Sequence, residues 1–162
     1  LYEADDAHEA DYLRRRADGA GAAVVVALDG ETAVGAATCQ PMAQAHAPVR
    51  EAFLAAGRDP ATHCYFGESV LLPQYRGQGI GVAFMAAREA VAREAGLATA
   101  AFCAVERAAD DPRRPPGHAP LDGFWRNRGY AHHPELACTF RWREIGGADD
   151  VPHRLSFWLK QL

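Results

Sequence analysis

In the stretch LLPQYRGQGIGVAF, residues 71–84, alternating glycines join a strand-like segment to a helix-like segment. Gly77, Gly79 and Gly81 remove Cβ atoms where the strand would turn into the helix. The unpaired amides of the first helical turn can then approach an anion, and the helix dipole favours negative charge there. A tight turn alone needs only one glycine, so the pattern favours a phosphate cradle over a simple turn.

Two common phosphate-binding motifs do not fit this stretch. A P-loop would continue into Gly-Lys-Ser/Thr, but Val82 and Ala83 follow Gly81, so the lysine and the magnesium-binding hydroxyl are missing. A dinucleotide fingerprint needs the spacing G-x-G-x-x-G, which residues 77–81 do not have. The sequence therefore disfavours nucleotide hydrolysis and dinucleotide binding.

The segments around the cradle alternate between strand and helix patterns. Asp29-Gly30 predicts a hairpin turn, and Pro73 ends an apolar run. The strand, helix, strand succession around the cradle predicts a parallel crossover. We expect helices over residues 5–16, 49–56, 81–96 and 121–129, and strands over residues 22–28, 31–39, 63–72, 97–106, 135–145 and 154–162.

The helix over residues 81–96 has the clearest pattern. Its apolar residues, among them Phe84 and Met85, share one face. The charged residues predicted on the opposite, solvent-facing side are Arg88, Glu89, Arg93 and Glu94.

Composition limits the class of protein. The chain has 162 residues, 49% of them hydrophobic, which is enough for one buried core. A net charge of −4 disfavours nucleic acid as a partner, and no apolar run reaches the roughly 20 residues of a membrane span. We expect a cytoplasmic protein with free, buried cysteines. The chain begins with leucine, so we expect residues upstream, where a first strand of the fold could lie.

Residues 76–81, RGQGIG, match the Q/R-x-x-G-x-G/A signature of the GNAT family of N-acetyltransferases, and the preceding VLLPQYRG is equally typical. The chain resembles this family from the hairpin to the last strand. The resemblance implies an α/β fold with a mixed sheet of six or seven strands, in a single domain over residues 1–162. It also implies acetyl-CoA as cosubstrate and an amine as acceptor.

The resemblance places the pyrophosphate of acetyl-CoA on the glycine loop and the pantetheine arm along the end of the preceding strand. The residues expected to contact the cosubstrate are Val70, Leu71, Leu72, Arg76, Gly77, Gln78, Gly79, Ile80, Gly81, His118 and Trp125. A strand that splays from its neighbour would leave backbone groups free for the amide-rich arm.

Glu68 is the candidate general base, because it lies on the strand that leads into the loop. The alternatives for Glu68 are a solvent-facing carboxylate, or one that only binds a cationic amine. Glu106, at the end of the next strand, is the second candidate.

The general acid is where the chain departs from the family, which often has a tyrosine at the position of Trp125. An indole proton is too weakly acidic to protonate the departing thiolate. Solvent, His118 and Tyr130 remain as proton sources, and departure of the thiolate without protonation is the other alternative. Trp125 is expected to pack against the cofactor arm or the core.

Several further possibilities follow from the sequence. The histidines lack metal-ligand spacing, so we expect no metal. The acceptor is open, as is transfer of another acyl group, and a CoA-binding sensor or partner module without transfer activity is the alternative function. The aromatic C-terminal strands could extend a sheet across a homodimer.

Overall fold

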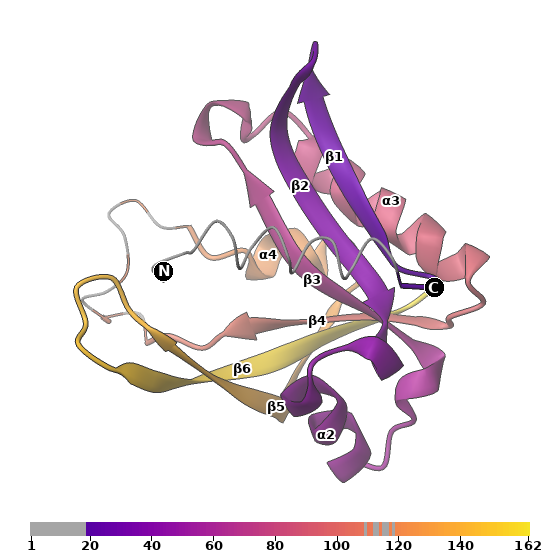
Figure 1. Cartoon of the computed structure of the whole chain (residues 1–162), viewed down its shortest axis with the longest axis vertical. Helices are drawn as coiled ribbons and strands as arrows, with labels where there is room; N and C mark the ends of the chain where they lie inside the picture. The colour runs from indigo at the N-terminus through magenta and orange to yellow at the C-terminus, as the bar shows by residue number, and fades with distance from the viewer. Residues whose placement is uncertain (1–18, 109, 112–113, 115–116, 118) are drawn as a thin grey trace.

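The structure is a computed structural model that describes residues 19–108, 110–111, 114, 117 and 119–162. The helix expected over residues 5–16 lies outside the described residues. Figure 1 shows the path of the chain, with the hairpin β1–β2 at the top and helix α2 at the bottom.

The described residues form one six-stranded sheet in the order β1-β2-β3-β4-β6-β5. Within the part of the chain that the structure describes, β3 and β4 are the one parallel pair, so the expected mixed sheet with a parallel step in the middle is confirmed. The strands are β1 (Ala23–Asp29), β2 (Thr32–Pro41), β3 (His63–Leu71), β4 (Thr99–Val105), β5 (Ala131–Arg143) and β6 (Asp150–Gln161), and the α-helices are α2 (Ala47–Ala55), α3 (Ile80–Glu94) and α4 (Asp122–Arg126).

The expected boundaries agree with these elements to within a few residues, apart from β5 and β6, each of which starts four residues earlier than expected. The hairpin turn lies where Asp29-Gly30 predicts it, because Asp29 pairs with Thr32 and Gly30 has φ 58°. Three short 3₁₀ turns join the elements: η1 (Met42–Gln44), η2 (Pro60–Thr62) and η3 (Pro73–Tyr75).

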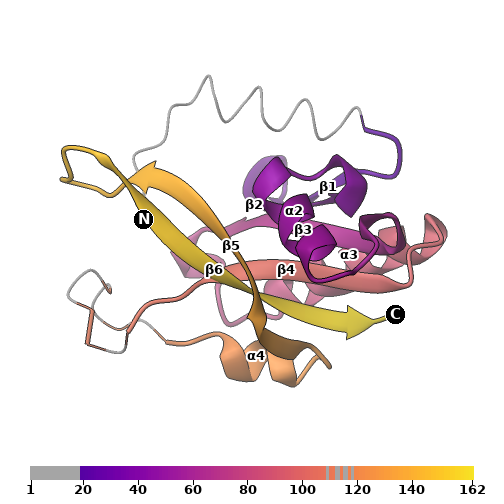
Figure 2. The ribbon, with the colours of Figure 1, turned by 90° about the horizontal axis from the view of Figure 1, so that it is seen from below.

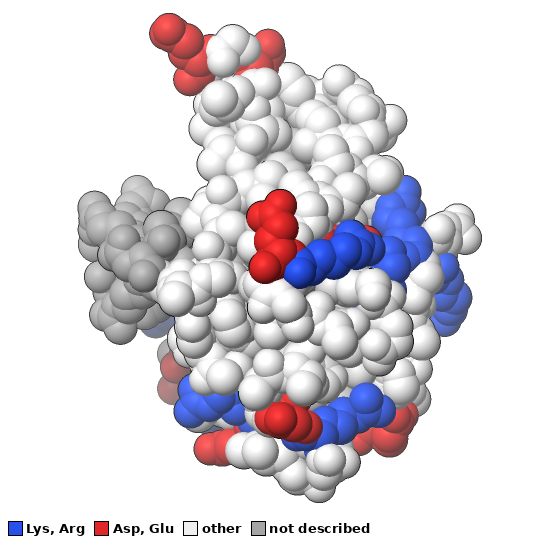
Figure 3. Space-filling view, turned by 90° about the vertical axis from the view of Figure 1, so that its right-hand side faces the viewer, with Lys and Arg blue, Asp and Glu red and all other residues white. Residues whose placement is uncertain are grey.

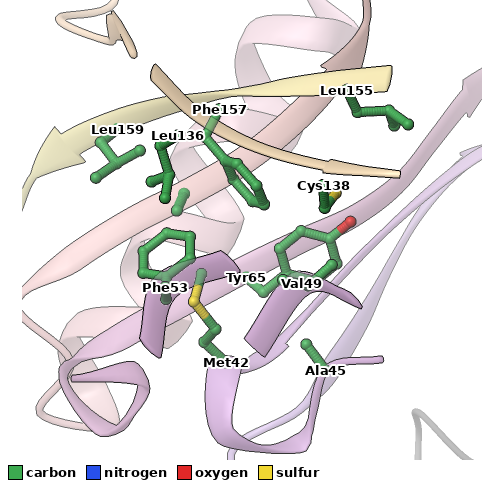
Figure 4. Close-up of a cluster of buried hydrophobic side chains, with 11 residues drawn as sticks. Met42, Ala45, Val49, Phe53, Tyr65, Leu136, Cys138, Leu155, Phe157 and Leu159 are labelled. Carbon is green, nitrogen blue, oxygen red and sulfur yellow. The ribbon is translucent and has the colours of Figure 1, made fainter. Parts of the chain in front are cut away.

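Two hydrophobic clusters cover the two faces of the sheet. Along β4, Ala101 belongs to one cluster and Phe102 to the other, since successive side chains of a strand point to opposite faces. Helix α2 lies on one side of the sheet and α4 on the other (Figure 2). Figure 4 shows the cluster under α2, in which Phe53 from the helix meets Phe157 from the sheet with ring centroids 5.0 Å apart.

Helix α3 covers the other face of the sheet, and two of its charged residues are buried, contrary to expectation. Arg88 and Glu89 were expected to face solvent, but only 3% and 7% of their surface is exposed. The carboxylate of Glu89 accepts hydrogen bonds from Tyr130 and Lys160, and the guanidinium of Arg88 lies over the ring of Phe66, 4.5 Å from its centroid. Partners from distant segments therefore compensate the burial of both charges.

Charged side chains of both signs lie on the side of the molecule that carries α3 and the C-terminus. Figure 3 shows them next to one another in bands, with a largely uncharged area between the bands. None of the helices in the described residues is long and apolar enough to cross a membrane.

Candidate functional site

The glycine loop connects β3 to α3 and has the backbone shape that glycine permits. Gly77 has φ 76°, and Gly79, the residue that caps α3, has φ 86° and ψ −7°. Only glycine adopts this left-handed conformation routinely. The first hydrogen bonds of the helix are donated by the amides of Val82 and Ala83 to the carbonyl of Gly79. The amides of Ile80 and Gly81 precede them, at the positive end of a 15-residue helix.

Side chains of the loop bond back to its own backbone. Arg76 Nε donates to the carbonyl of Leu71 at 3.2 Å, and Gln78 Nε2 donates to that of Gln74 at 3.0 Å. The hydroxyl of Tyr75 donates to Asp29 at 2.7 Å, which ties the loop to the tip of the hairpin. The loop is therefore held in one shape with its amides at an exposed helix end, an arrangement that fits a phosphate group.

Strands β3 and β4 pair over only three residues before they diverge. The last pair is Tyr65 with Ala101, although β3 continues to Leu71. Beyond this point β3 pairs only with β2, and Figure 1 shows the two strands running apart. Val70 and Leu72 are 59% and 44% exposed there. The backbone edge of β3 on the β4 side is thus open where the pantetheine arm was expected.

A β-bulge sets the position of Glu68. Ala37 pairs with Ser69 and Cys39 pairs with Phe66, so Thr38 alone faces two residues of β3, Gly67 and Glu68. The buried hydroxyl of Thr38 accepts a hydrogen bond from the amide of Glu68 at 3.0 Å. Glu68 therefore lies at the point where β3 leaves β4, and its side chain is exposed.

Three polar groups lie near Glu68 on the α2 face. The hydroxyl of Tyr65 is 3.4 Å from the sulfur of Cys103, and Figure 4 shows it pointing towards Cys138. Hydrogen bonding with Cys138 lowers the pKa of Cys103, whereas the negative charge of Glu68 acts in the opposite direction. Tyr65, Cys103 and Cys138 thus form a group of polar side chains on the α2 face of the sheet.

The second candidate base has a different environment. Glu106 forms an ion pair with Arg154, and the hydrogen bond from Arg154 lowers the pKa of Glu106. A carboxylate stabilised in its charged form is a weak base. The geometry favours Glu68 over Glu106 for proton removal.

The candidate proton donors are constrained as well. Tyr130 is 2% exposed and donates to Glu89 at 3.1 Å, and burial raises its pKa far above the usual range. Trp125 packs against Phe102 and Trp158, with centroids 5.0 Å away in both cases, so its core contacts are confirmed. His118 lies outside the described residues. Of the two candidate side chains, these contacts constrain Tyr130 alone, so solvent and His118 stay as candidate proton sources.

Sequence reasoning missed two features of the site. The bulge at Glu68 depends on the register between β2 and β3, and Thr38 carries no signal of it. The ring of Phe124 lies against the start of α3, because a Cβ at Gly81 would be 3.5 Å from its Cζ atom. At this distance a Cβ would be in ordinary van der Waals contact, so the approach of α4 leaves room for a small side chain at position 81 and does not by itself require glycine.

Among the described residues, no group of three or more histidine, cysteine, aspartate or glutamate side chains could hold a metal ion. The site consists of the glycine loop, the open edge of β3 and the carboxylate of Glu68.

Comparison with known sequences identifies the family of the chain. The sequence model of the acetyltransferase (GNAT) family matches residues 1–115. The chain belongs to the GNAT family of acetyltransferases. No curated protein sequence matches it.

Solved structures of acetyltransferases share the fold. A ribosomal-protein-alanine N-acetyltransferase from Brucella melitensis has a TM-score of 0.61 at 19% identity, with 98% of this chain and 80% of that chain covered. An aminoglycoside 6′-N-acetyltransferase in complex with coenzyme A has a TM-score of 0.60 at 13% identity, with coverage of 97% and 81%. A structure described as a streptothricin acetyltransferase from Bacillus anthracis, in complex with acetyl coenzyme A, has a TM-score of 0.57 at 11% identity, with coverage of 92% and 67%.

Proposed function

We propose that this protein transfers an acetyl group from acetyl-CoA to an amine. The observation that carries the proposal is the left-handed glycine cap of α3, in the loop that follows β3. The edge of β3 is open on the β4 side, and its bulge contains Glu68. The two named relatives with N-acetyltransferase activity act on an alanine of a ribosomal protein and on an aminoglycoside, and these names support nitrogen as the acceptor atom.

Each part of the site has one task in this reaction. Bound acetyl-CoA supplies the acetyl group as a thioester. The amides at the start of α3 bind its pyrophosphate, and the exposed edge of β3 at Val70 and Leu72 holds the amide-rich arm. The cradle and the strand edge thereby direct the thioester towards Glu68.

Glu68 accepts a proton from the acceptor amine, directly or through one water molecule. The amine nitrogen forms a bond with the carbonyl carbon while the carbon–sulfur bond breaks, and the thiolate takes its proton from solvent. Transfer is direct, because no covalent intermediate with the protein is needed.

Calorimetric titration with acetyl-CoA and CoA, followed by a screen of amines for CoA release, tests the proposal. We expect binding at micromolar or tighter affinity, and loss of binding in Gly79→Glu, whose side chain would enter the cradle. Glu68→Gln should bind acetyl-CoA normally but lower kcat by about 10²- to 10⁴-fold. Glu31→Gln, on the exposed hairpin tip, is the control. Absence of binding by the wild type would overturn the acetyltransferase function.

A second function is favoured by one observation: Tyr130 is tied to Glu89 and Trp125 is packed in the core. A CoA-binding sensor without transfer activity would need no proton donor. Binding that Gly79→Glu abolishes, with no CoA release for any amine tested, would support the sensor.

A further inference from the structure

Arg128, which follows α4, lies close to the glycine loop. The ring of Phe124 touches the first turn of α3, since a Cβ at Gly81 would be 3.5 Å from Phe124 Cζ. The guanidinium carbon of Arg128 lies 3.6 Å from the centroid of the same ring, and Nη1 donates to the carbonyl of Phe124 at 2.6 Å. A chain of direct contacts thus connects the cation of Arg128 to the helix end.

Arg128 has no carboxylate partner within the described residues, in contrast to other arginines of the molecule. Arg126, on the same helix, lies 4.0 Å from Asp122, and Arg107 lies 2.5 Å from Glu144. In addition, the Nε atom of Arg128 is buried without a hydrogen-bond partner. A guanidinium with an unsatisfied donor and no counter-charge is costly, and an anion at its exposed edge would offset part of that cost through its charge.

The orientation of Arg128 suits a phosphate. Stacking on Phe124 fixes the plane of the guanidinium, so little conformational freedom remains to be lost when a ligand binds. A guanidinium binds phosphate oxygens through parallel N–H donors at its edge. The loop amides and the dipole of α3 favour an anion at the helix end next to Phe124, the ring on which Arg128 stacks.

We propose that Arg128 binds a phosphate group at the nucleotide end of coenzyme A and thereby makes the protein prefer the complete coenzyme over shortened forms. This inference rests on the proposed function. The phosphate is either the 3′-phosphate of the ribose or the pyrophosphate, and the two can be distinguished with CoA and 3′-dephospho-CoA.

The experiment compares dissociation constants of CoA and 3′-dephospho-CoA, by calorimetry at several salt concentrations, for the wild type, Arg128→Gln and Arg128→Lys. Arg126→Gln is the matched control, because its side chain is 62% exposed and lies near Asp122. Thermal unfolding verifies that each variant is folded. We expect Arg128→Gln to weaken CoA binding tenfold or more and to reduce its salt dependence, since one charge contact is lost. Arg128→Lys should recover part of the affinity, and Arg126→Gln should stay within twofold of the wild type.

If the 3′-phosphate is the partner, Arg128→Gln leaves the affinity for 3′-dephospho-CoA unchanged; if the pyrophosphate is the partner, both ligands lose affinity equally. An unchanged affinity for CoA in Arg128→Gln would overturn the inference while the proposed function stands. The inference would also be overturned if Arg128→Gln lost affinity for both ligands equally, with unchanged salt dependence and no recovery in Arg128→Lys. Arg128 would then only support the ring of Phe124. A wild type that binds neither ligand would instead overturn the proposed function.

Discussion

Gly79 is the residue on which the start of α3 depends. A Cβ at this position would meet nothing within 4 Å, so a substitution is opposed by the backbone conformation and not by a steric clash. Because φ is 86°, we expect Gly79→Ala to lower the free energy of unfolding by about 1–2 kcal/mol, as measured by urea denaturation. Gly123, inside α4, is the control: Gly123→Ala should be neutral or stabilising by up to about 1 kcal/mol. Equal effects of the two substitutions would contradict this account.

His63 gives the folded protein a pH dependence of known sign. Burial lowers the pKa of His63 from its ordinary value of 6.5, and the charge of Arg58 adds to this, while the bond to the carbonyl of Asp59 and the charge of Asp59 oppose it. Below pH 6.5 the unfolded chain binds a proton that the folded protein excludes. Stability contributed by the neutral ring is therefore present above pH 6.5 and lost as the pH falls through 6.5.

Urea denaturation between pH 5 and pH 8 measures this effect. We expect the loss of stability towards acidic pH to be smaller in His63→Gln than in the wild type. If His63→Gln showed the same dependence of unfolding free energy on pH as the wild type, groups other than His63 would be the cause of that dependence.

The sequence predicts some residues of the site and not others, for a physical reason. Gly77 and Gly79 are predictable, because the conformation they adopt is a local property of the backbone. The burial of Glu89 is not predictable from the helical pattern, since its partners Tyr130 and Lys160 are 41 and 71 residues away. Helical periodicity describes one helix, whereas burial depends on what packs against it.

Among the described strands and helices, the bulged strand β3 carries the largest number of residues proposed for the site. Strand, turn and helix around the cradle follow from apolar runs, Pro73 and the glycines. The bulge at Gly67 and Glu68 does not follow from the sequence pattern, because it arises from the pairing of β3 with β2. A change of register is not encoded in either strand alone.

Thr38→Val tests how the bulge positions Glu68. The substitution keeps the shape of the side chain but removes the acceptor of the Glu68 amide, so we expect a loss of about 1–2 kcal/mol of unfolding free energy. If Glu68 is the base, kcat should fall more than the affinity for acetyl-CoA does. Thr38→Ser retains the hydroxyl and should behave as the wild type in both assays. If the Thr38→Val variant were folded and its kcat unchanged, catalysis would not depend on the hydrogen bond at the bulge.

At the scale of the whole molecule, the cradle helix is fixed to the far end of the sheet by one buried carboxylate. Lys160, near the end of β6, donates to both oxygens of Glu89 at 2.8 Å, and Tyr130, which follows α4, donates to one of them at 3.1 Å. Glu89 thus joins α3, the segment after α4 and the last strand. These are the elements that bring Gly81 and Phe124 together at the proposed phosphate site.

Lys160→Met should therefore destabilise the entire domain, by about 2 kcal/mol in unfolding free energy, because Glu89 would stay buried without its closest cation. Arg93→Met is the matched control, since Arg93 is bound to the same carboxylate at 3.4 Å but is 52% exposed, and its loss should cost less than about 0.5 kcal/mol. In the double variant Glu89→Gln/Lys160→Met the carboxylate and its closest cation are removed together, so the combined loss should be smaller than the sum of the single losses. Strictly additive losses in urea denaturation would mean that the pair does not act as a unit, and that α3 is held to the sheet by apolar contacts alone.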